Sequence, residues 1–177
     1  KIDFTSHAVG QDEGGYNAKE LRAGGVSAHE LRKGKVFFVV DEFKNGAWTT
    51  RELKEGGFTA ADMKLCGYVA AELRKTGFSV QDLVHGGFPI AELRAVGATA
   101  SELRDAYVSA KQLSEVGYSA KELLVAGFSA KELIACGFGV PALREAGFDA
   151  IQLRQLGFTS KELKAYGYGA ASLKEAG

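Results

Sequence analysis

Apolar and polar positions follow one another along this chain with a period of ten residues. Most periods contain an aromatic residue and, five residues later, a leucine that is followed in most copies by a basic residue. Leu21 and Leu31 mark two copies, and the positions from Leu53 to Leu173 mark thirteen more in unbroken register, with Met63 at one of them. A period kept over so many copies predicts a repeat architecture in which each copy packs against its neighbours.

Each copy carries the start and stop signals of one short helix. In the clearest copy, residues 128–137, Ser129 is placed as the N-cap and Glu132 as its partner in a capping box. Phe128 is positioned before the cap to contact Leu133 as a hydrophobic staple. Gly137 is placed to adopt the left-handed conformation that ends a helix. The pattern therefore predicts a helix of roughly six or seven residues in every copy.

Stacking is expected to stabilise these helices, because an isolated helix needs roughly 12–15 residues to be even marginally stable in water. The aromatic residue, the alanine after the cap, the leucine and the small residue before the glycine share one face and are predicted to point inward. The acidic residue before the leucine and the basic residue after it are predicted to point outward. We expect a mainly α solenoid of ten-residue units. If each corner turns near a right angle, about four units would close one coil.

The alternation of leucine and phenylalanine every five residues resembles pentapeptide-repeat proteins, and this resemblance would imply a β-helix. In that architecture the residue two before the leucine is small and points inward, whereas here it is often a lysine, as at Lys111, Lys121 and Lys131. Burying a row of ammonium groups is prohibitively unfavourable, and segments such as Glu-Leu-Lys favour a helix. We therefore favour the helical solenoid. The pattern also resembles generic short helical repeats of the decapeptide type, a likeness that implies no function.

The register is interrupted between the second copy and the thirteen contiguous ones. Val36 to Val40 is a β-branched and aromatic run, and Asn45-Gly46 is a turn signal typical of hairpins. Residues 36–48 are therefore predicted to form a strand and a small β-hairpin. We accordingly divide the chain into an N-terminal region, 1–48, and a repeat region, 49–177.

Two roles are open for this predicted insertion. It can cap the apolar end of the solenoid, as terminal units of repeat proteins do. Alternatively, its strand at 36–40 can pair with another chain by edge addition or homodimerisation. The residues that would make this contact are Phe37, Phe38 and Val39.

A second departure concerns the residue after the leucine. It is basic in most copies but becomes Val84 once and then Ser114, Leu124 and Ile134 in three consecutive copies, and Val125 follows Leu124. An exposed apolar patch on a protein surface often marks a contact site. Leu124, Val125 and Ile134 are therefore candidate partner contacts, and the alternative is that local coiling buries them.

Composition and charge narrow the functional classes. Lys and Arg total 22 and so do Asp and Glu, which leaves no net charge to release counterions from nucleic acid. Nucleic-acid binding along the Arg/Lys row is therefore the least favoured function. No apolar run approaches the roughly 18 residues of a membrane span. Cys66 and Cys136 have no partner motif, so we expect them to be reduced in an intracellular, cytoplasmic protein that was processed or excised ahead of Lys1.

No catalytic constellation is evident in the sequence. His29 and His85 fall at outward helix positions, and both cysteines fall at the inward position before a glycine. The acidic residues are accounted for as capping partners, and no phosphate-binding loop is present. We expect no enzyme activity, cofactor or metal. The favoured function is a scaffold for protein–protein interaction, and the alternative is a structural spacer that self-assembles through the strand at 36–40.

Overall fold

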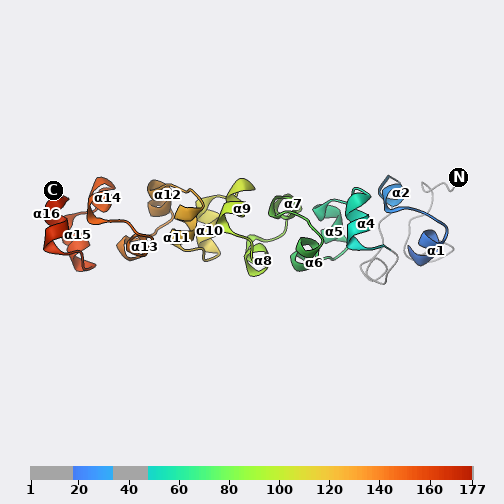
Figure 1. Ribbon diagram of the computed structural model, residues 1–177, viewed down its shortest axis with the longest axis horizontal. Coiled ribbons are helices and arrows are strands. Elements are labelled where there is room, and N and C mark those ends of the chain that lie inside the picture. The colour runs from blue at the N-terminus through green and yellow to red at the C-terminus, as the bar shows by residue number, and fades with distance from the viewer. Residues whose placement is uncertain (1–17, 34–47, 177) are drawn as a thin grey trace. The chain divides into compact units, whose positions relative to one another are not determined.

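The computed structural model describes residues 18–33 and 48–176 of the chain (Figure 1). Within these ranges the chain forms short α-helices of six residues each, separated by four-residue connections or by the stretch outside the described ranges. The helices are α1 (Ala18–Ala23), α2 (Ala28–Lys33), α4 (Thr50–Glu55), α5 (Ala60–Leu65), α6 (Ala70–Lys75), α7 (Val80–His85), α8 (Ile90–Ala95), α9 (Ala100–Asp105), α10 (Ala110–Glu115), α11 (Ala120–Val125), α12 (Ala130–Ala135), α13 (Val140–Glu145), α14 (Ala150–Gln155), α15 (Ser160–Ala165) and α16 (Ala170–Glu175). The prediction of a mainly helical repeat with ten-residue units is confirmed over these residues.

Most helices begin at a side-chain cap. In α12 the Ser129 hydroxyl accepts from the Glu132 amide at 3.3 Å, and the Glu132 carboxylate accepts from the Ser129 amide at 2.7 Å. The same reciprocal pair begins α10 and α14, where a glutamine replaces the glutamate. These bonds satisfy two of the amides that a helix start leaves without partners. The N-caps with both bonds are Ser27, Thr49, Thr59, Ser79, Thr99, Ser109, Ser119, Ser129, Asp149 and Thr159.

The start of α6 is completed from another helix. Val69 stands at its N-cap and has no side chain that could accept a hydrogen bond. The Ala70 amide donates instead to the carboxylate of Glu92 in α8, at 2.8 Å. Glu92 is available for this contact because its own helix follows Pro89, which has no amide hydrogen to offer a capping box.

Most described helices end in a Schellman motif. After α11, for example, the Phe128 amide donates to the Leu123 carbonyl at 3.0 Å and the Gly127 amide donates to the Leu124 carbonyl at 2.9 Å. Gly127 has φ of +89°, a conformation that costs a residue with a Cβ atom roughly 1–2 kcal/mol. Tyr107 is the described non-glycine residue with positive φ, at +64°, and its side chain is 87% exposed.

The repeat leucine is the centre of the core. The leucine positions from Leu31 to Leu163, Met63 included, are fully buried within the described ranges, and Leu173 near the end is half-buried. The aromatic residue and the alanine after the cap are buried in most units. The residue before the glycine is buried or half-buried in most units and exposed at Tyr166. This inward set follows the expected face of the helix.

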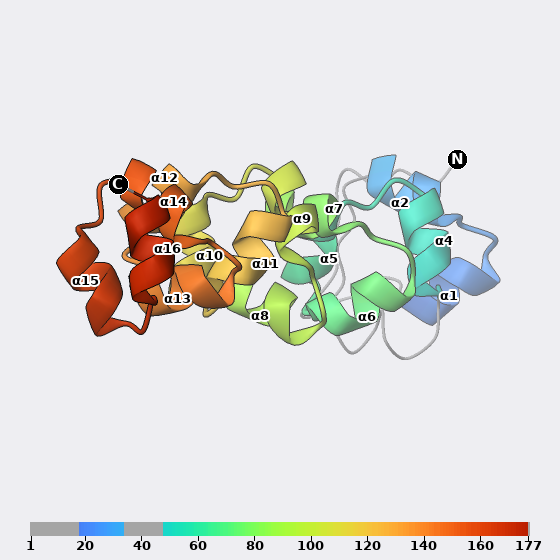
Figure 2. The same ribbon diagram turned by 60° about the vertical axis from the view of Figure 1, so that its left-hand side comes forward.

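Contacts join adjacent helices of the repeat, such as α11 and α12, and also helices two or three repeats apart along the chain. Within 97–177, α11 packs against α9 and α13, and α14 packs against α16 (Figures 1 and 2). The Tyr118 hydroxyl donates to the Ala98 carbonyl, 20 residues earlier, and Arg22 pairs with Glu52, 30 residues later. The expectation of about four units per coil is therefore wrong, because stacked neighbours lie between two and three units apart.

The approach of stacked helices requires small residues at particular positions. A Cβ atom added at Gly56, at the end of α4, would lie 2.6 Å from the Cβ atom of Ala28 at the start of α2. A Cβ atom at Gly86 would lie 2.8 Å from that of Ala60 in the same way. Glycine before the helix-ending glycine therefore allows a closer stack than the alanine or valine found elsewhere.

Two compact units divide the chain, Lys1–Val96 and Gly97–Gly177. The strand and hairpin predicted over 36–48 lie, apart from Trp48, outside the described residues. Trp48 is buried, at the aromatic position ahead of α4. Helices and turns make up 18–33 and 48–176 without a strand, so the predicted hairpin has no support from the described part of the chain.

Candidate functional site

In several repeats the basic residue after the leucine connects its helix to the end of another helix. Lys54 of α4 donates from Nζ to the carbonyl of Gly77, which follows α6, and its ammonium lies 4.7 Å from the ring centroid of Phe78. Lys64 of α5 makes the same two contacts with Gly87 and Phe88, at 5.4 Å from the ring. We call this arrangement a cation clamp.

In the second compact unit, Gly97–Gly177, arginine takes the place of the clamp lysine. The Arg104 guanidinium lies 5.5 Å from the Phe128 ring, and the Arg144 guanidinium lies 5.2 Å from the Tyr168 ring. Arg144 also donates from Nη1 to the Tyr166 carbonyl at 2.5 Å. The carbonyls at a helix C-terminus carry partial negative charge, and so does the face of an aromatic ring. The clamps of Lys54, Lys64 and Arg144 therefore place one cation against two acceptors, whereas Arg104 contacts the ring; each fastens one coil to the next.

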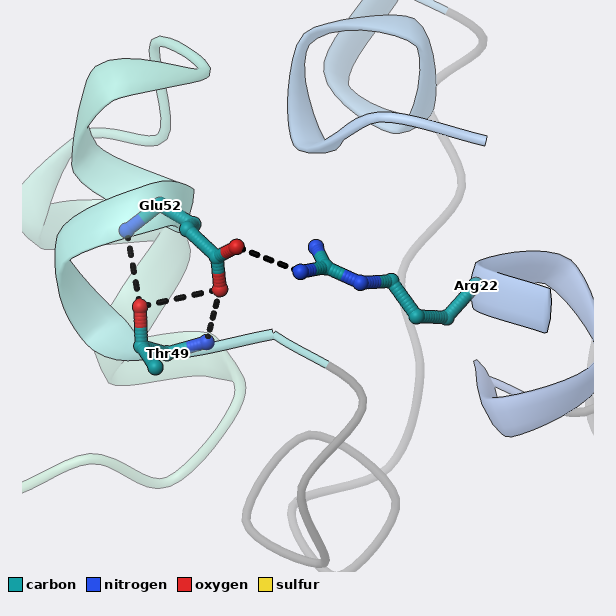
Figure 3. Close-up of polar contacts among 3 residues, drawn as sticks. All are labelled: Arg22, Thr49 and Glu52. Atoms are coloured by element: carbon teal, nitrogen blue, oxygen red, sulfur yellow. Dashed lines mark hydrogen bonds and ion pairs between the residues drawn. The ribbon is translucent and has the colours of Figure 1, made fainter. Parts of the chain in front are cut away.

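Near the beginning of the chain, the corresponding arginines pair with acidic residues. Arg22 of α1 donates to the Glu52 carboxylate of α4 at 2.5 Å (Figure 3). The Arg22 guanidinium also lies 5.9 Å from the Trp48 ring. Hydrogen bonds from the Thr49 backbone and from Arg22 lower the pKa of Glu52 to about 2. Arg32 of α2 pairs with Asp62 of α5 at 3.1 Å.

Three consecutive units, α10 to α12, lack the clamp cation, because Ser114, Leu124 and Ile134 stand at its position. The register of the clamp places these residues toward the glycines that end α12, α13 and α14. A Cβ atom added at any of those glycines would find no described atom within 4 Å, whereas one at Gly127 would lie 3.0 Å from Arg104. These glycines are Gly137, Gly147 and Gly157, and Gly25, Gly57 and Gly97 have the same open space.

The aromatic residues beyond these glycines are less covered than their counterparts. Phe78, Phe88 and Phe128, which lie under clamp cations, are buried. Phe138 and Phe148 are half-buried, although complete units precede and follow both of them. Phe158, which also lacks a clamp cation, is half-buried, and so is Tyr168, which lies under Arg144 but near the end of the described chain. Loss of the clamp is therefore accompanied by exposure of aromatic surface at Phe138 and Phe148.

The candidate contact residues fall on this part of the fold. Val125 at the end of α11 is 77% exposed, while Leu124 and Ile134 are half-buried. Leu124 lies on α11 and Ile134 on α12, and these two helices pack against each other. The other candidates, Phe37, Phe38 and Val39, lie outside the described residues. The clamp itself was missed from the sequence, although basic and aromatic residues recur 24 positions apart.

Other reactive side chains are separate from one another. His29 and His85 are exposed, and Cys136 is half-buried. Burial raises the pKa of the Cys66 thiol to about 11, which keeps it protonated and unreactive at neutral pH. Within 18–33 and 48–176, no three His, Cys, Asp or Glu side chains are arranged to hold a metal ion. Each described helix has six residues and is too short to cross a bilayer.

The repeat register also has a counterpart among known families. The family model described as a decapeptide repeat region matches residues 57–130 and 117–177, which together span more than half of the chain. This chain belongs to the decapeptide-repeat family. The matches of the decapeptide-repeat family include the clamp position from Lys64 onward and therefore cover Leu124 and Ile134. No curated protein and no solved structure matches the chain.

Proposed function

We propose that this decapeptide-repeat protein is a non-enzymatic scaffold that binds a protein partner through the surface around Leu124, Val125 and Ile134. The observation that carries the proposal is the absence of the clamp cation in α10, α11 and α12, where the repeat otherwise keeps its leucine and its helix-ending glycine. The departure is therefore confined to the position that covers the neighbouring aromatic ring.

Three features support a contact at this surface. Val125 exposes most of its apolar side chain, and Phe138 and Phe148 expose part of their rings. Leucine and isoleucine cannot donate to the open glycine carbonyls, so these acceptors remain available to another molecule. Apolar surface combined with hydrogen-bonding groups is typical of protein interfaces.

The test replaces the two residues with the residue that the repeat uses elsewhere. In the L124R/I134R variant, each arginine can form a clamp like that of Arg104, so the fold is retained while the apolar surface is covered. A photo-crosslinking amino acid at position 125 reports contact with a partner in extracts of the source cells. We expect crosslinked products from the otherwise native chain and their loss in L124R/I134R.

The matched control places the same photo-crosslinker at Leu65. Leu65 is 82% exposed and follows Lys64, which forms a clamp, just as Val125 follows Leu124, which does not. We expect few products from position 65 and no effect of L124R/I134R on them. Equal labelling at positions 65 and 125, or products at 125 that persist in L124R/I134R, would contradict the proposed function.

A further inference from the structure

Three consecutive helices without a clamp cation, α10, α11 and α12, carry a basic residue at a different position, whereas α7, where Val84 also replaces the cation, has Gln81 there. The residue two before the leucine is a lysine in each of them, whereas the flanking helices have Ser101 in α9 and Pro141 in α13 there. Those flanking helices keep their cation at the clamp position, as Arg104 and Arg144. In α10, α11 and α12 the positive charge therefore lies three residues closer to the helix start than the clamp position does. The three residues are Lys111, Lys121 and Lys131.

These lysines do not stabilise the repeat in any visible way. All three are exposed, and none of them forms an ion pair within the described part of the chain. They lie in the first helical turn, where the helix dipole disfavours positive charge. A clamp cation has the opposite position, because it contacts carbonyls at a helix C-terminus. The displaced lysines therefore have their charge available to another molecule.

Each of these lysines is a surface neighbour of the residue that replaces the clamp cation in its own helix. Residues three apart on a helix are neighbours on its surface, so Lys121 lies beside Leu124 and Lys131 lies beside Ile134. Val125 adds a largely exposed apolar side chain at the end of α11. Helices α10, α11 and α12 also pack against one another in pairs. Cationic and apolar groups therefore alternate over one group of contacting helices.

We infer that α10, α11 and α12 bind an acidic, amphipathic segment of a partner protein, with its carboxylates on Lys111, Lys121 and Lys131 and its apolar side chains on Leu124, Val125 and Ile134. This inference rests on the proposed function and adds the chemistry of the partner. Charge complementarity selects carboxylates, and the half-covered apolar side chains select a segment that also carries apolar residues. A nucleic-acid backbone would use the lysines alone, and the chain as a whole has no net charge to attract it.

Binding of model peptides to the full chain tests this inference. The probe is a fluorescent peptide of Leu-Glu-Glu-Leu repeats, and its controls are Leu-Lys-Lys-Leu repeats, oligoglutamate and duplex DNA, all followed by fluorescence anisotropy. We expect the Leu-Glu-Glu-Leu peptide to bind most tightly and the K111Q/K121Q/K131Q variant to weaken its binding about tenfold. The matched control R51Q/K161Q removes cations from the same helix position in α4 and α15 and should leave binding unchanged.

The outcomes separate this inference from the proposed function. Equal binding by K111Q/K121Q/K131Q and the native chain, or stronger binding of any control probe, would overturn the inference. If the inference fails in this way but L124R/I134R still abolishes crosslinking at position 125, the surface binds a partner and only the inferred chemistry of that partner is wrong. If neither peptide binding nor crosslinking responds to its variant, both proposals fail. Unchanged circular dichroism spectra would show that the variants keep the fold.

Discussion

At the residue scale, the ends of each helix are held by hydrogen bonds that the repeat can supply from more than one place. Ser129 and Glu132 cap α12 from within its own unit, whereas Glu92 provides the acceptor that Val69 lacks at the start of α6. A short helix has few amides, so each unsatisfied one removes a large share of its stabilisation. Departures at single cap positions are therefore tolerated where another helix supplies the bond.

The hydrogen bond to Glu92 that caps α6 can be tested with a double-mutant cycle. E92A removes the acceptor of the Ala70 amide and should lower the free energy of unfolding by about 0.5–2 kcal/mol, the range measured for lost N-caps. V69T supplies an acceptor within α6, so E92A should cost little in the V69T background. Chemical denaturation of the four proteins measures the coupling. If E92A lowers the free energy of unfolding equally in the native chain and in the V69T background, Glu92 does not cap α6.

Protonation of Glu52 gives a second test at this scale. The Thr49 backbone and Arg22 hold its pKa at about 2, below the ordinary value of 4.5, so the contribution of this carboxylate to stability is fully present above about pH 4.5. That contribution is lost as the pH falls toward 2, because protonation removes the charge that Thr49 and Arg22 stabilise. We expect an NMR titration of the side chain to give the lowered pKa. R22Q should raise it only part of the way, since the Thr49 bonds remain.

A pKa of Glu52 that is unchanged in R22Q would show that the pair in Figure 3 does not persist in solution. A pKa near 4.5 in the native chain would contradict the capping box as well.

At the element scale, the glycine at the corner between two helices meets two requirements: a positive φ and space for the clamp cation. Gly127 adopts positive φ, and its missing side chain leaves room for the Arg104 guanidinium. Gly137 has nearly the same φ, +88° against +89°, but no described atom within 4 Å of an added Cβ. The two corners therefore differ in the clamp and not in the backbone.

This pair of glycines isolates the energy of the clamp. G127A and G137A should each lose roughly 1–2 kcal/mol through backbone strain. G127A should lose up to about 0.5–1 kcal/mol more, since its methyl group displaces the cation from the Phe128 ring. In the R104A background the two substitutions should cost the same. Thermal unfolding measures these differences, and equal costs in the native background would mean that the clamp contributes nothing.

At the scale of the whole molecule, sequence reasoning succeeds where its signals are local. The N-cap, the acidic partner and the helix-ending glycine lie within ten residues, so each helix could be placed from the sequence. The stacking of units could not, because a small change in the angle of each corner accumulates over successive units. The role of Lys54 as a clamp on Gly77 and Phe78 was missed for the same reason: it depends on which helices are neighbours.

The interruption near the N-terminus shows a different limit. Phe43 lies ten residues before Leu53, with Glu42 before it and Lys44 after it, so this part of the sequence fits the decapeptide register as well as the pattern of a strand. Local propensity alone does not separate these possibilities. The candidate surface at Leu124 and Ile134 was found because a substitution within a regular repeat can be identified without knowing how the units stack.

The most direct test of the account is the melting temperature of the L124R/I134R variant. If Leu124 and Ile134 occupy open clamp positions, each arginine should add about 0.5–1 kcal/mol by covering Phe148 or Phe158. The melting temperature should then rise by roughly 2–4 °C for each kcal/mol gained. A melting temperature below that of the native chain would show that both residues belong to the core, and the proposed interaction surface would be wrong.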